Sequence, residues 1–520
     1  MHIIIPMSGM SNRFLEEGYD VPKFLIKIHG KYVIEHVINL YPNNCKFSVI
    51  INDHHSKTTN IIEILENLNL NLSVYIIEKH KLGPAYAISK IFDKIEDNEN
   101  VVVNYCDFSM DWRYEDFNKF VKNTNVEGCI ITYTGFHPHM LHGSNYAFCK
   151  INENNDLIQI KEKESFTSDK MSEHASTGTY YFKSGELLKK YITHLIENDI
   201  SINGEFYISL AYNKLVEDKL TCKVFEIKHM LQWGTPFDLK EYLYWSDIFE
   251  KLSTYSNNFE LKNYMTILPM AGEGQRFSRN GFKIHKPLLP INNYNMFEQA
   301  IKCLPKTNST YLGVLKDKDI FDTAYNKIVI DKLLPGQACT VEKMINNIFS
   351  PNPLLVSSCD NGVLIDFEKL KNLIDDNVDI IVWTYKNSYS NIHNPDMYSW
   401  VNVDNNENIT SVDVKNFGNR GNPMEHLSIV GTFLFKNSEV FLNSIKKLYK
   451  SETKTNGEYY IDNLINSSIE LGYKVKNFQV DSYICWGTPN DYKTFNYWQS
   501  FFDGFELHPY QINQCFFSKK

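Results

Sequence analysis

Two stretches of the sequence combine a strand-like apolar run, a loop of small residues, an arginine and a lysine. The clearer one is residues 265–289, MTILPMAGEGQRFSRNGFKIHKPLL, and its echo is residues 2–26, HIIIPMSGMSNRFLEEGYDVPKFLI. In both stretches the lysine follows the arginine by ten residues (23 − 13 and 286 − 276). Backbone N–H groups reach an anion only where no side chain intervenes, so an apolar run opening into small residues is typical of a strand feeding a phosphate-binding loop. The two stretches therefore predict two anion sites.

Composition limits the class of protein. The chain has 520 residues, 43% hydrophobic and 22% charged, which is ordinary globular composition with room for two or more domains. A net charge of −9 argues against a nucleic-acid partner or an acidic-membrane surface and leaves room for a local cationic pocket. The ten cysteines form no CxxC pair, which favours reduced thiols over disulfides or zinc.

No apolar stretch approaches the length of a membrane span, and the first apolar run is too short for a signal peptide. We therefore expect a cytoplasmic protein without membrane insertion, present as a monomer or small homo-oligomer.

An internal repeat organises the chain. WGTPFDLKEYLYW from Trp233 recurs as WGTPNDYKTFNYW from Trp486, and NGEFYI from Asn203 recurs as NGEYYI from Asn456. These pairs lie 253 residues apart (486 − 233), whereas the glycine loops lie 263 apart (276 − 13). A period this long indicates two complete domains rather than solenoid units. We expect domain 1 over residues 1–251, a linker at 252–263 and domain 2 over 264–520.

Strand and helix patterns alternate in each half. In the first half we expect strands at residues 3–5, 47–51, 72–77 and 101–105, and helices at 33–40, 59–68 and 85–95. This alternation predicts an α/β fold with a mostly parallel, doubly wound sheet. Ligands of such sheets bind beyond the carboxyl ends of the strands, where the glycine loops are expected to lie.

Both halves resemble the sugar nucleotidyltransferases, the pyrophosphorylases that make NDP-sugars and related activated alcohols on a Rossmann-like (GT-A-like) domain. The resemblance rests on the loop at 272–277, the Pro22-Lys23 step, a strand ending in Cys-Asp, the Glu162-Lys163 pair and the WGTP motif. It covers roughly residues 1–245 and 264–498.

The resemblance implies a Mg²⁺-dependent enzyme that joins a sugar or polyol phosphate to a nucleoside triphosphate and releases pyrophosphate. Loop N–H groups would hold the nucleotide, an arginine would neutralise the departing pyrophosphate, and a lysine would lie against the α-phosphate. The expected catalytic residues are Arg13, Lys23, Arg276 and Lys286. The expected nucleotide-binding residues are Met7, Ser8, Gly9, Gly83, Met270, Ala271, Gly272, Gly274 and Gly336.

Asp107 and Asp360 each end a predicted strand and are the expected Mg²⁺ ligands, although either could instead cap a following helix. A second carboxylate ligand could come from Asp238 and Asp491 of the WGTPxD motifs, which could equally be helix caps.

The acceptor phosphate is expected at Lys163 and Lys415, the family's acceptor lysine in each copy. The other expected substrate-binding residues are Gly178, Glu205, Gly431 and Glu458. The glutamates suit hydrogen bonds to substrate hydroxyls, or simply favour the dipole of the helix that they begin.

The copies depart from the family pattern in different ways. Domain 1 has Ser11 in the glycine loop, which we expect to make its anion loop less permissive, and domain 2 has Val414 in place of the glutamate before the lysine. His137, His139 and His142 favour substrate contact or loop packing over zinc, because acidic or cysteine partners at ligand spacing are missing.

Two other functions stay open. A GT-A glycosyltransferase would use a sugar nucleotide, but its usual Asp-x-Asp motif is not found at residues 107–109 or 360–362. Alternatively, one half is catalytic and the other a regulatory copy. The resemblance favours a tandem transferase that supplies an activated precursor for surface polysaccharide or glycoconjugate synthesis.

Overall fold

The computed structural model describes the chain except residues 144–145, 319–320, 349, 377 and 519–520. It divides into unit 1, Met1–Ser246 with Phe505–His508, and unit 2, Asp247–Gly504 with Pro509–Lys520. No helix in the described part of the chain is long and apolar enough to cross a membrane.

The division falls inside helix α9 (Pro236–Thr254), earlier than the predicted linker at residues 252–263. The first residues of that segment end α9, and its last ones begin strand β14 (Glu260–Pro269). The helix continues because Ile248, Phe249 and Leu252 are buried at helical spacing.

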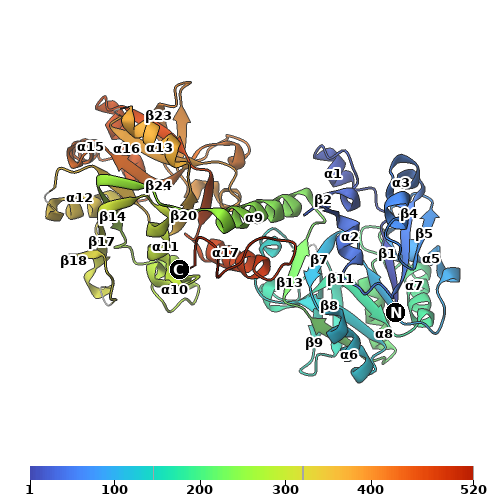
Figure 1. Cartoon of the computed structure of the whole chain (residues 1–520). Coiled ribbons are helices and arrows are strands. Elements are labelled where there is room, and N and C mark those ends of the chain that lie inside the picture. The colour runs from blue at the N-terminus through green and yellow to red at the C-terminus, as the bar shows by residue number, and fades with distance from the viewer. Residues whose placement is uncertain (144–145, 319–320, 349, 377, 519–520) are drawn as a thin grey trace. The chain divides into compact units, whose positions relative to one another are not determined.

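Unit 1 is an α/β unit around a mixed, mostly parallel sheet (Figure 1). Its strands are β1 (His2–Pro6), β4 (Lys46–Asn52), β5 (Leu72–Ile77), β6 (Val101–Asn104), β8 (Gly128–Tyr133), β9 (Ala147–Ile151), β10 (Leu157–Glu162), β11 (His174–Phe182) and β12 (Cys222–Glu226). The order is β10-β9-β11-β6-β1-β4-β5, with β8 between β11 and β12. Neighbours β5, β4, β1 and β6 are parallel, and β11 runs antiparallel to β6 and β8.

Helices cover both faces of this sheet. They are α1 (Asn12–Glu16), α2 (Val33–Ile38), α3 (Asp53–Thr58), α4 (Ile61–Glu66), α5 (Gly83–Ser89), α6 (Tyr114–Thr124), α7 (Gly185–Glu197) and α8 (Ile208–Glu217). Ile3 and Ile5 pack with α2, α4 and α6 in one apolar cluster, and Ile4 packs with α5, α7 and α8 in another. Side chains alternate across a strand, so the continuous apolar run of β1 supplies both cores.

Unit 2 repeats this arrangement in the same order. Its main strands are β14, β17 (Lys306–Leu315), β18 (Asn326–Ile330), β19 (Leu354–Ser357), β21 (Ile380–Tyr385), β22 (Trp400–Val403), β23 (Ile409–Asp413), β24 (Ser428–Phe435) and β25 (Val475–Gln479). The order is β18-β17-β14-β19-β24-β21-β25, with β24 antiparallel to β19 and β21. Its helices are α10 (Gln275–Arg279), α11 (Met296–Cys303), α12 (Gln337–Ile348), α13 (Phe367–Asp375), α14 (Ser390–His393), α15 (Ser438–Ser451), α16 (Ile461–Glu470) and α17 (Pro489–Phe502). The α/β fold predicted from the sequence is thus confirmed.

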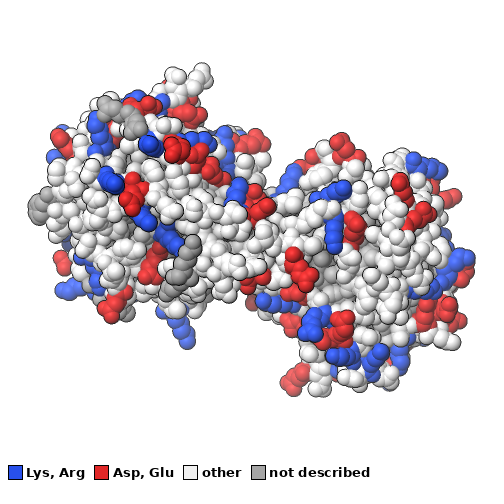
Figure 2. All heavy atoms as spheres, in the orientation of Figure 1, with Lys and Arg blue, Asp and Glu red and all other residues white. Residues whose placement is uncertain are grey.

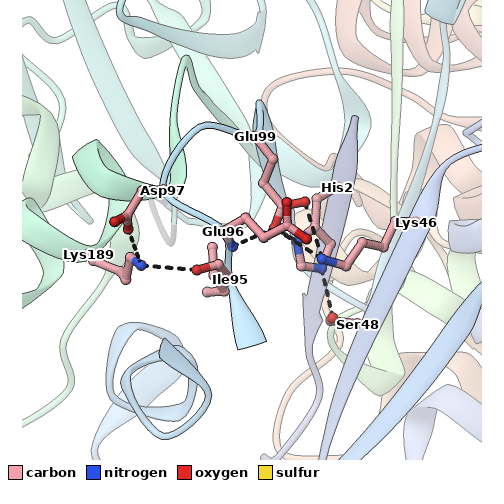
Figure 3. A network of polar contacts seen from close by, with 8 residues as sticks. All are labelled: His2, Lys46, Ser48, Ile95, Glu96, Asp97, Glu99 and Lys189. Atoms are coloured by element: carbon pink, nitrogen blue, oxygen red, sulfur yellow. Dashed lines mark hydrogen bonds and ion pairs between the residues drawn. The ribbon is translucent and has the colours of Figure 1, made fainter. Parts of the chain in front are cut away.

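A polar network fixes the amino end of β1 (Figure 3). His2 is fully buried, and its ring nitrogens lie 2.6 Å from Glu99 and 2.7 Å from Ser48 of β4. Lys46 also reaches Glu99, at 3.2 Å. Because β4 and the segment just before β6 share this network, the strand that leads into the glycine loop is held at its start.

Surface charge gives little guidance to the site. On the face shown in Figure 2, lysines and arginines are interspersed with aspartates and glutamates in each unit. The cations that matter for an anionic ligand are therefore sought inside pockets.

One asparagine in each unit docks a helix onto a strand. Asn213 of α8 accepts a hydrogen bond from the Ile160 N–H at 2.9 Å and donates to the Ile160 carbonyl at 3.0 Å. Asn466 of α16 does the same with Val412, at 2.8 Å in both directions. These helices carry residues of the candidate sites, so the asparagines fix their register against β10 and β23.

We expect Asn213→Ala and Asn466→Ala each to lower the free energy of unfolding by about 2 kcal/mol, because each leaves a strand N–H and carbonyl without a partner. Urea unfolding measures the loss, with the exposed Glu197→Gln on α7 as control. Losses no larger than that of the control would contradict the docking role.

Candidate active site

The two glycine loops have the same backbone shape although their residues differ. Gly274 begins α10 in the left-handed conformation (φ 67°), and Ser11 begins α1 with φ 56°. The left-handed conformation costs serine free energy that it does not cost glycine. The Ser11 hydroxyl, however, accepts a hydrogen bond from the Lys23 N–H at 3.2 Å. The substitution that we expected to make the unit 1 loop less permissive leaves its left-handed turn in place.

A lysine–aspartate pair lies beside each loop. The Lys23 ammonium is 2.6 Å from the Asp107 carboxylate, and Lys286 bonds Asp360 in the same way. Both lysines begin a short 3₁₀ helix (Lys23–Leu25 and Lys286–Leu288), and both aspartates follow a central strand. The structure therefore brings together the lysine and the aspartate predicted for each site.

Electrostatics favours the charged forms of Lys23, Lys286 and Asp360. Burial by itself would lower the pKa of Lys23, but the Asp107 carboxylate outweighs it and raises that pKa above its usual value. The pKa of Lys286 is raised in the same way. Burial opposes the charge of Asp360, yet Lys286 holds the pKa of Asp360 below its usual range.

The glycine of each WGTP motif makes room for the aspartate, a role that we did not predict. The Trp233 N–H donates to the Asp107 carbonyl at 3.0 Å, which brings Gly234 against the carboxylate. A Cβ at Gly234 would lie 2.8 Å from Asp107 Oδ2, and one at Gly487 would lie 3.3 Å from Asp360 Oδ2. The motif itself was the available signal, but the contact joins residues far apart in the sequence.

Gly83 and Gly336 each lie close to the backbone of another segment, where a side chain would not fit. Each has a positive φ, and a Cβ would lie 2.8 Å from the Phe206 nitrogen or 2.5 Å from that of Tyr459. The Phe206 N–H donates to the Leu82 carbonyl at 2.9 Å, which closes the contact. The predicted nucleotide loop is thus clamped to the segment that carries the predicted Glu205 or Glu458.

The acceptor lysines have matching environments in the two units. Lys163 donates to the Tyr207 hydroxyl at 2.6 Å, and Lys415 to the Tyr460 hydroxyl at 3.0 Å. Both lysines are left-handed, with φ of 61° and 50°. A non-glycine residue adopts this backbone conformation only at a cost in free energy. We infer that the surrounding structure imposes it, and it places each ammonium over its tyrosine.

Glu205 reaches the lysine through a tyrosine. The Tyr207 hydroxyl bonds Glu205, and Glu458 likewise bonds Tyr460. Gly178 and Gly431 each have a positive φ and a carbonyl that accepts from the N–H of residue 105 or 358. In unit 1, Lys163 and Gly178 line one pocket and Glu205 lines the adjoining one, and their counterparts have matching contacts in unit 2.

Two adjoining pockets in unit 1 hold these residues. The first, of about 280 Å³, lies under the glycine loop; its lining includes Met7, Ser8, Gly9, Lys23, Gly83 and Glu205. The second, of about 240 Å³, includes Arg13, Glu162, Lys163, Gly178 and Asp238. Tyr105, Asp107 and Tyr207 line both pockets, so the aspartate stands at their junction.

Unit 2 has a corresponding loop pocket and a second pocket that lies along the glycine loop, and Lys415, Gly431 and Asp491 line neither of these two. One of about 340 Å³ is lined by residues that include Met270, Ala271, Gly272, Gly336 and Asp360. One of about 450 Å³ includes Arg276. Gly274, Lys286 and Glu458 line both.

The linings reveal a difference that sequence reasoning missed. His80 and Lys81 line the loop pocket of unit 1, where unit 2 has Leu333 and Leu334. His80 also lies 3.3 Å from the Ser8 hydroxyl. These two lining positions are thus polar in unit 1 and apolar in unit 2.

Asp238 and Asp491 lie in the first turns of helices α9 and α17. Each accepts from a threonine hydroxyl at 2.6 Å (Thr235 and Thr488), and each donates its N–H back to that hydroxyl at 3.1 or 3.2 Å. Burial raises the pKa of Asp238 to about 6, against the Thr235 bond. The threonine hydroxyl, and not the aspartate carboxylate, therefore accepts the helix N–H in each motif, and metal binding by the aspartates stays a prediction.

The histidines of unit 1 pack against an aromatic side chain. His139 lies 3.0 Å from the Tyr133 hydroxyl, and the ring of His137 is 4.4 Å from that of Tyr133. Within the described residues, no group of three or more His, Cys, Asp or Glu side chains is arranged to hold a metal.

We expect Gly234→Ala to lower the pKa of Lys23, because the added Cβ displaces the Asp107 carboxylate and leaves burial unopposed. NMR of ¹³C-methylated lysines measures this pKa. Gly487→Ala is the matched variant and should disturb Lys286 less, since its Cβ has more room. Equal shifts in the two variants, or none, would contradict the steric argument.

A second prediction concerns Glu241, which burial near Asp238 gives a pKa of about 8. Between its unfolded pKa of about 4.3 and this value, the unfolded chain loses a proton that the folded chain keeps, so the free energy of unfolding falls as pH rises. Glutamine does not titrate, so the free energy of unfolding of Glu241→Gln should not fall in this way. Relative to wild type, it should rise by about 3 kcal/mol between about pH 5 and about pH 8. Urea unfolding at both pH values tests this, and a constant difference would contradict it.

Comparisons with known proteins agree with the geometry of unit 1. The family model described as nucleotidyl transferase matches residues 4–260. The bifunctional protein GlmU of Buchnera aphidicola subsp. Baizongia pistaciae (strain Bp) is 26% identical over 211 residues, which cover 40% of this chain and 43% of that protein. GlmU of Blochmanniella pennsylvanica (strain BPEN) is 27% identical over 213 residues, with the same coverage. The chain thus spans less than half the length of these relatives.

Solved structures are similar over part of the chain. The nucleoside-diphosphate-sugar pyrophosphorylase from Vibrio cholerae RC9 has a TM-score of 0.40 at 22% identity, covering 46% of this chain and 99% of that one. The inositol-1-phosphate CTP transferase from T. maritima has a TM-score of 0.36 at 16% identity, covering 46% and 90%. The family-level finding is that residues 4–260, which include nearly all of the unit 1 segment Met1–Ser246, match the nucleotidyl transferases.

Proposed function

We propose that each unit transfers a nucleotidyl group from a nucleoside triphosphate to a phosphomonoester and releases pyrophosphate. The observation that carries the proposal is the lysine–aspartate pair beside the glycine loop, at the junction of two pockets in unit 1 and repeated in unit 2. The family match of residues 4–260 supports the same reaction class.

The reaction needs no nucleophilic side chain. An oxygen of the acceptor phosphate forms a bond to the α-phosphorus, the bond from that phosphorus to the bridging oxygen breaks, and pyrophosphate leaves with the electron pair. Burial raises the pKa of the nearby Cys106 and Cys359 to about 12, so both stay protonated and are poor nucleophiles. Positioning and positive charge are the contributions that the protein can make.

The cations are arranged for these roles. Lys23 lies between the loop pocket and the aspartate, where it would contact the α-phosphate, and Arg13 lines the adjoining pocket. Lys286 and Arg276 would act in the same way in unit 2. Preorganised charges at such a centre contribute about 3 kcal/mol or more each.

Asp107 and Asp360 suit a Mg²⁺ ion. Mg²⁺ takes oxygen ligands and often only one or two carboxylates, with phosphate oxygens and water completing the shell. Asp107 lines both unit 1 pockets, where phosphate oxygens and such an ion would lie. Bound there, the ion would neutralise triphosphate charge.

Different linings imply different substrates. The polar residues His80 and Lys81 face the loop pocket of unit 1, and leucines face that of unit 2. We therefore propose two transferases of distinct specificity that make activated sugars or polyols for surface polysaccharide or glycoconjugate synthesis, and not one enzyme with a regulatory copy.

The test is pyrophosphate release with each of the four nucleoside triphosphates and a panel of sugar and polyol phosphates. We expect Asp107→Ala and Asp360→Ala each to lower a different activity by about 100-fold or more. Removal of Mg²⁺ with a chelator should abolish both activities. The exposed Asp93→Asn is the control.

Loss of one activity only would mean that the other unit is regulatory or structural. If no pair of substrates releases pyrophosphate while a sugar nucleotide is consumed, a glycosyltransferase replaces this proposal.

A further inference from the structure

The acceptor lysines differ in the carboxylate that accompanies them, and one pair of positions accounts for the difference. The first position is the residue before the lysine, and the second is a helix residue two positions after the tyrosine that the lysine contacts. The pair is Glu162 and Ser209 in unit 1, and the matching positions are Val414 and Asp462 in unit 2.

The alignment of these positions rests on structure as well as sequence. The asparagine that docks the helix is Asn213 in unit 1 and Asn466 in unit 2, four residues after Ser209 and Asp462. Each bonds both backbone groups of the strand residue two before the glutamate or the valine. Helix and strand therefore meet in the same register in both units.

In unit 1 the acid comes from the strand. Ser209 of α8 donates to the Glu162 carboxylate at 2.5 Å, and Glu162 lines the pocket that contains Lys163. Burial raises the pKa of Glu162, and the neighbouring Lys163 opposes that rise.

In unit 2 the acid comes from the helix. Val414 cannot carry charge, but Asp462 of α16 stands where unit 1 has serine, and Ser399 donates to it at 2.6 Å. Burial raises the pKa of Asp462, against the Ser399 bond and Lys415. Burial lowers the pKa of Lys415, which Asp462 and Glu458 oppose and Arg276 reinforces.

The exchange keeps one carboxylate at the helix–strand contact while moving it to the other partner. We propose that Asp462 is the acceptor-orienting carboxylate of unit 2 and does there what Glu162 does in unit 1. The inference rests on the proposed function, because it deepens the role of the same site.

The chemistry of the pair defines the ligand class. The lysine attracts a phosphate, whereas the carboxylate beside the lysine repels that phosphate. Hydroxyl groups of the ligand that donate hydrogen bonds to the carboxylate offset this repulsion. A site that keeps both groups suits a phosphomonoester with hydroxyls next to the phosphate, and disfavours inorganic phosphate. Both units then select hydroxylated acceptors.

The experiment uses the full chain with Asp107→Ala, so that unit 2 is observed. Asp462→Ser gives unit 2 the serine of unit 1 without its glutamate, and Val414→Glu with Asp462→Ser rebuilds the unit 1 pair. Calorimetry measures the affinities for inorganic phosphate, glucose 1-phosphate, glycerol 3-phosphate and ribitol 5-phosphate. Kinetics measures pyrophosphate release with the same phosphomonoesters.

We expect Asp462→Ser to lower the affinity for the phosphomonoester that binds best by about 10-fold relative to the affinity for inorganic phosphate. The affinity for inorganic phosphate itself should not fall. The KM for that acceptor should rise more than kcat falls, and the double variant should restore both ratios. A purely structural loss would weaken both ligands together. Glu470→Gln on the same helix, which removes an exposed ion pair with Lys447, is the matched control.

An unchanged ratio of affinities in Asp462→Ser, or a double variant that restores nothing, would overturn the inference even if unit 2 releases pyrophosphate. Conversely, a shifted and restored ratio without pyrophosphate release would support the inference and contradict the proposed reaction for unit 2.

Discussion

The pairing of Lys23 with Asp107, and of Lys286 with Asp360, is the interaction on which both candidate sites depend. These side chains are only 19–25% exposed, so each charge relies on its partner. A charged group left there alone would cost at least about 2 kcal/mol. Three separate segments supply the pair and its space: the 3₁₀ helix after the glycine loop, the loop that follows central strand β6 or β19, and the glycine of the WGTP motif. The sheet is what brings these segments to one edge.

The two units show that this geometry does not require identical residues. Serine in unit 1 and glycine in unit 2 begin the helix after the loop with nearly the same φ, because the serine hydroxyl also holds the backbone of the lysine. The acceptor lysines likewise share a left-handed backbone that neither would adopt by preference. Surrounding contacts override local propensity here, which is expected where a backbone must aim a functional side chain.

Much of the fold could be predicted from the sequence, because alternating strand and helix patterns are local signals. The strand predicted at residues 72–77 has those bounds in the structure, whereas the helix predicted at 85–95 ends at Ser89. Boundaries failed where a local pattern was misread, as with the buried apolar residues that extend α9 into the predicted linker. That Lys23 and Asp107 lie at one site agrees with the expectation that loops gather at the carboxyl ends of strands, whereas their direct ion pair was not predicted.

The remaining features of the site depend on contacts that no local pattern encodes. Gly83 was expected to bind the nucleotide, and no signal in the sequence indicated that it also packs against the backbone of Phe206, more than a hundred residues away. The WGTPxD aspartates were ambiguous because a carboxylate after threonine suits a cap and a metal equally well, and only the structure shows that the threonine hydroxyl is the group that caps each helix.

The carboxylate near each acceptor lysine is the strongest case for reasoning in contact pairs. Comparing Glu162 with Val414 alone suggests that unit 2 lost an acid, and comparing Ser209 with Asp462 alone suggests that it gained one. Because the docking asparagine holds helix and strand in the same register in both units, these are one change seen from two sides. The electrostatic field at the lysine depends on where negative charge lies and not on which element supplies it. A duplicated site can therefore keep its charge balance while its sequence motif disappears.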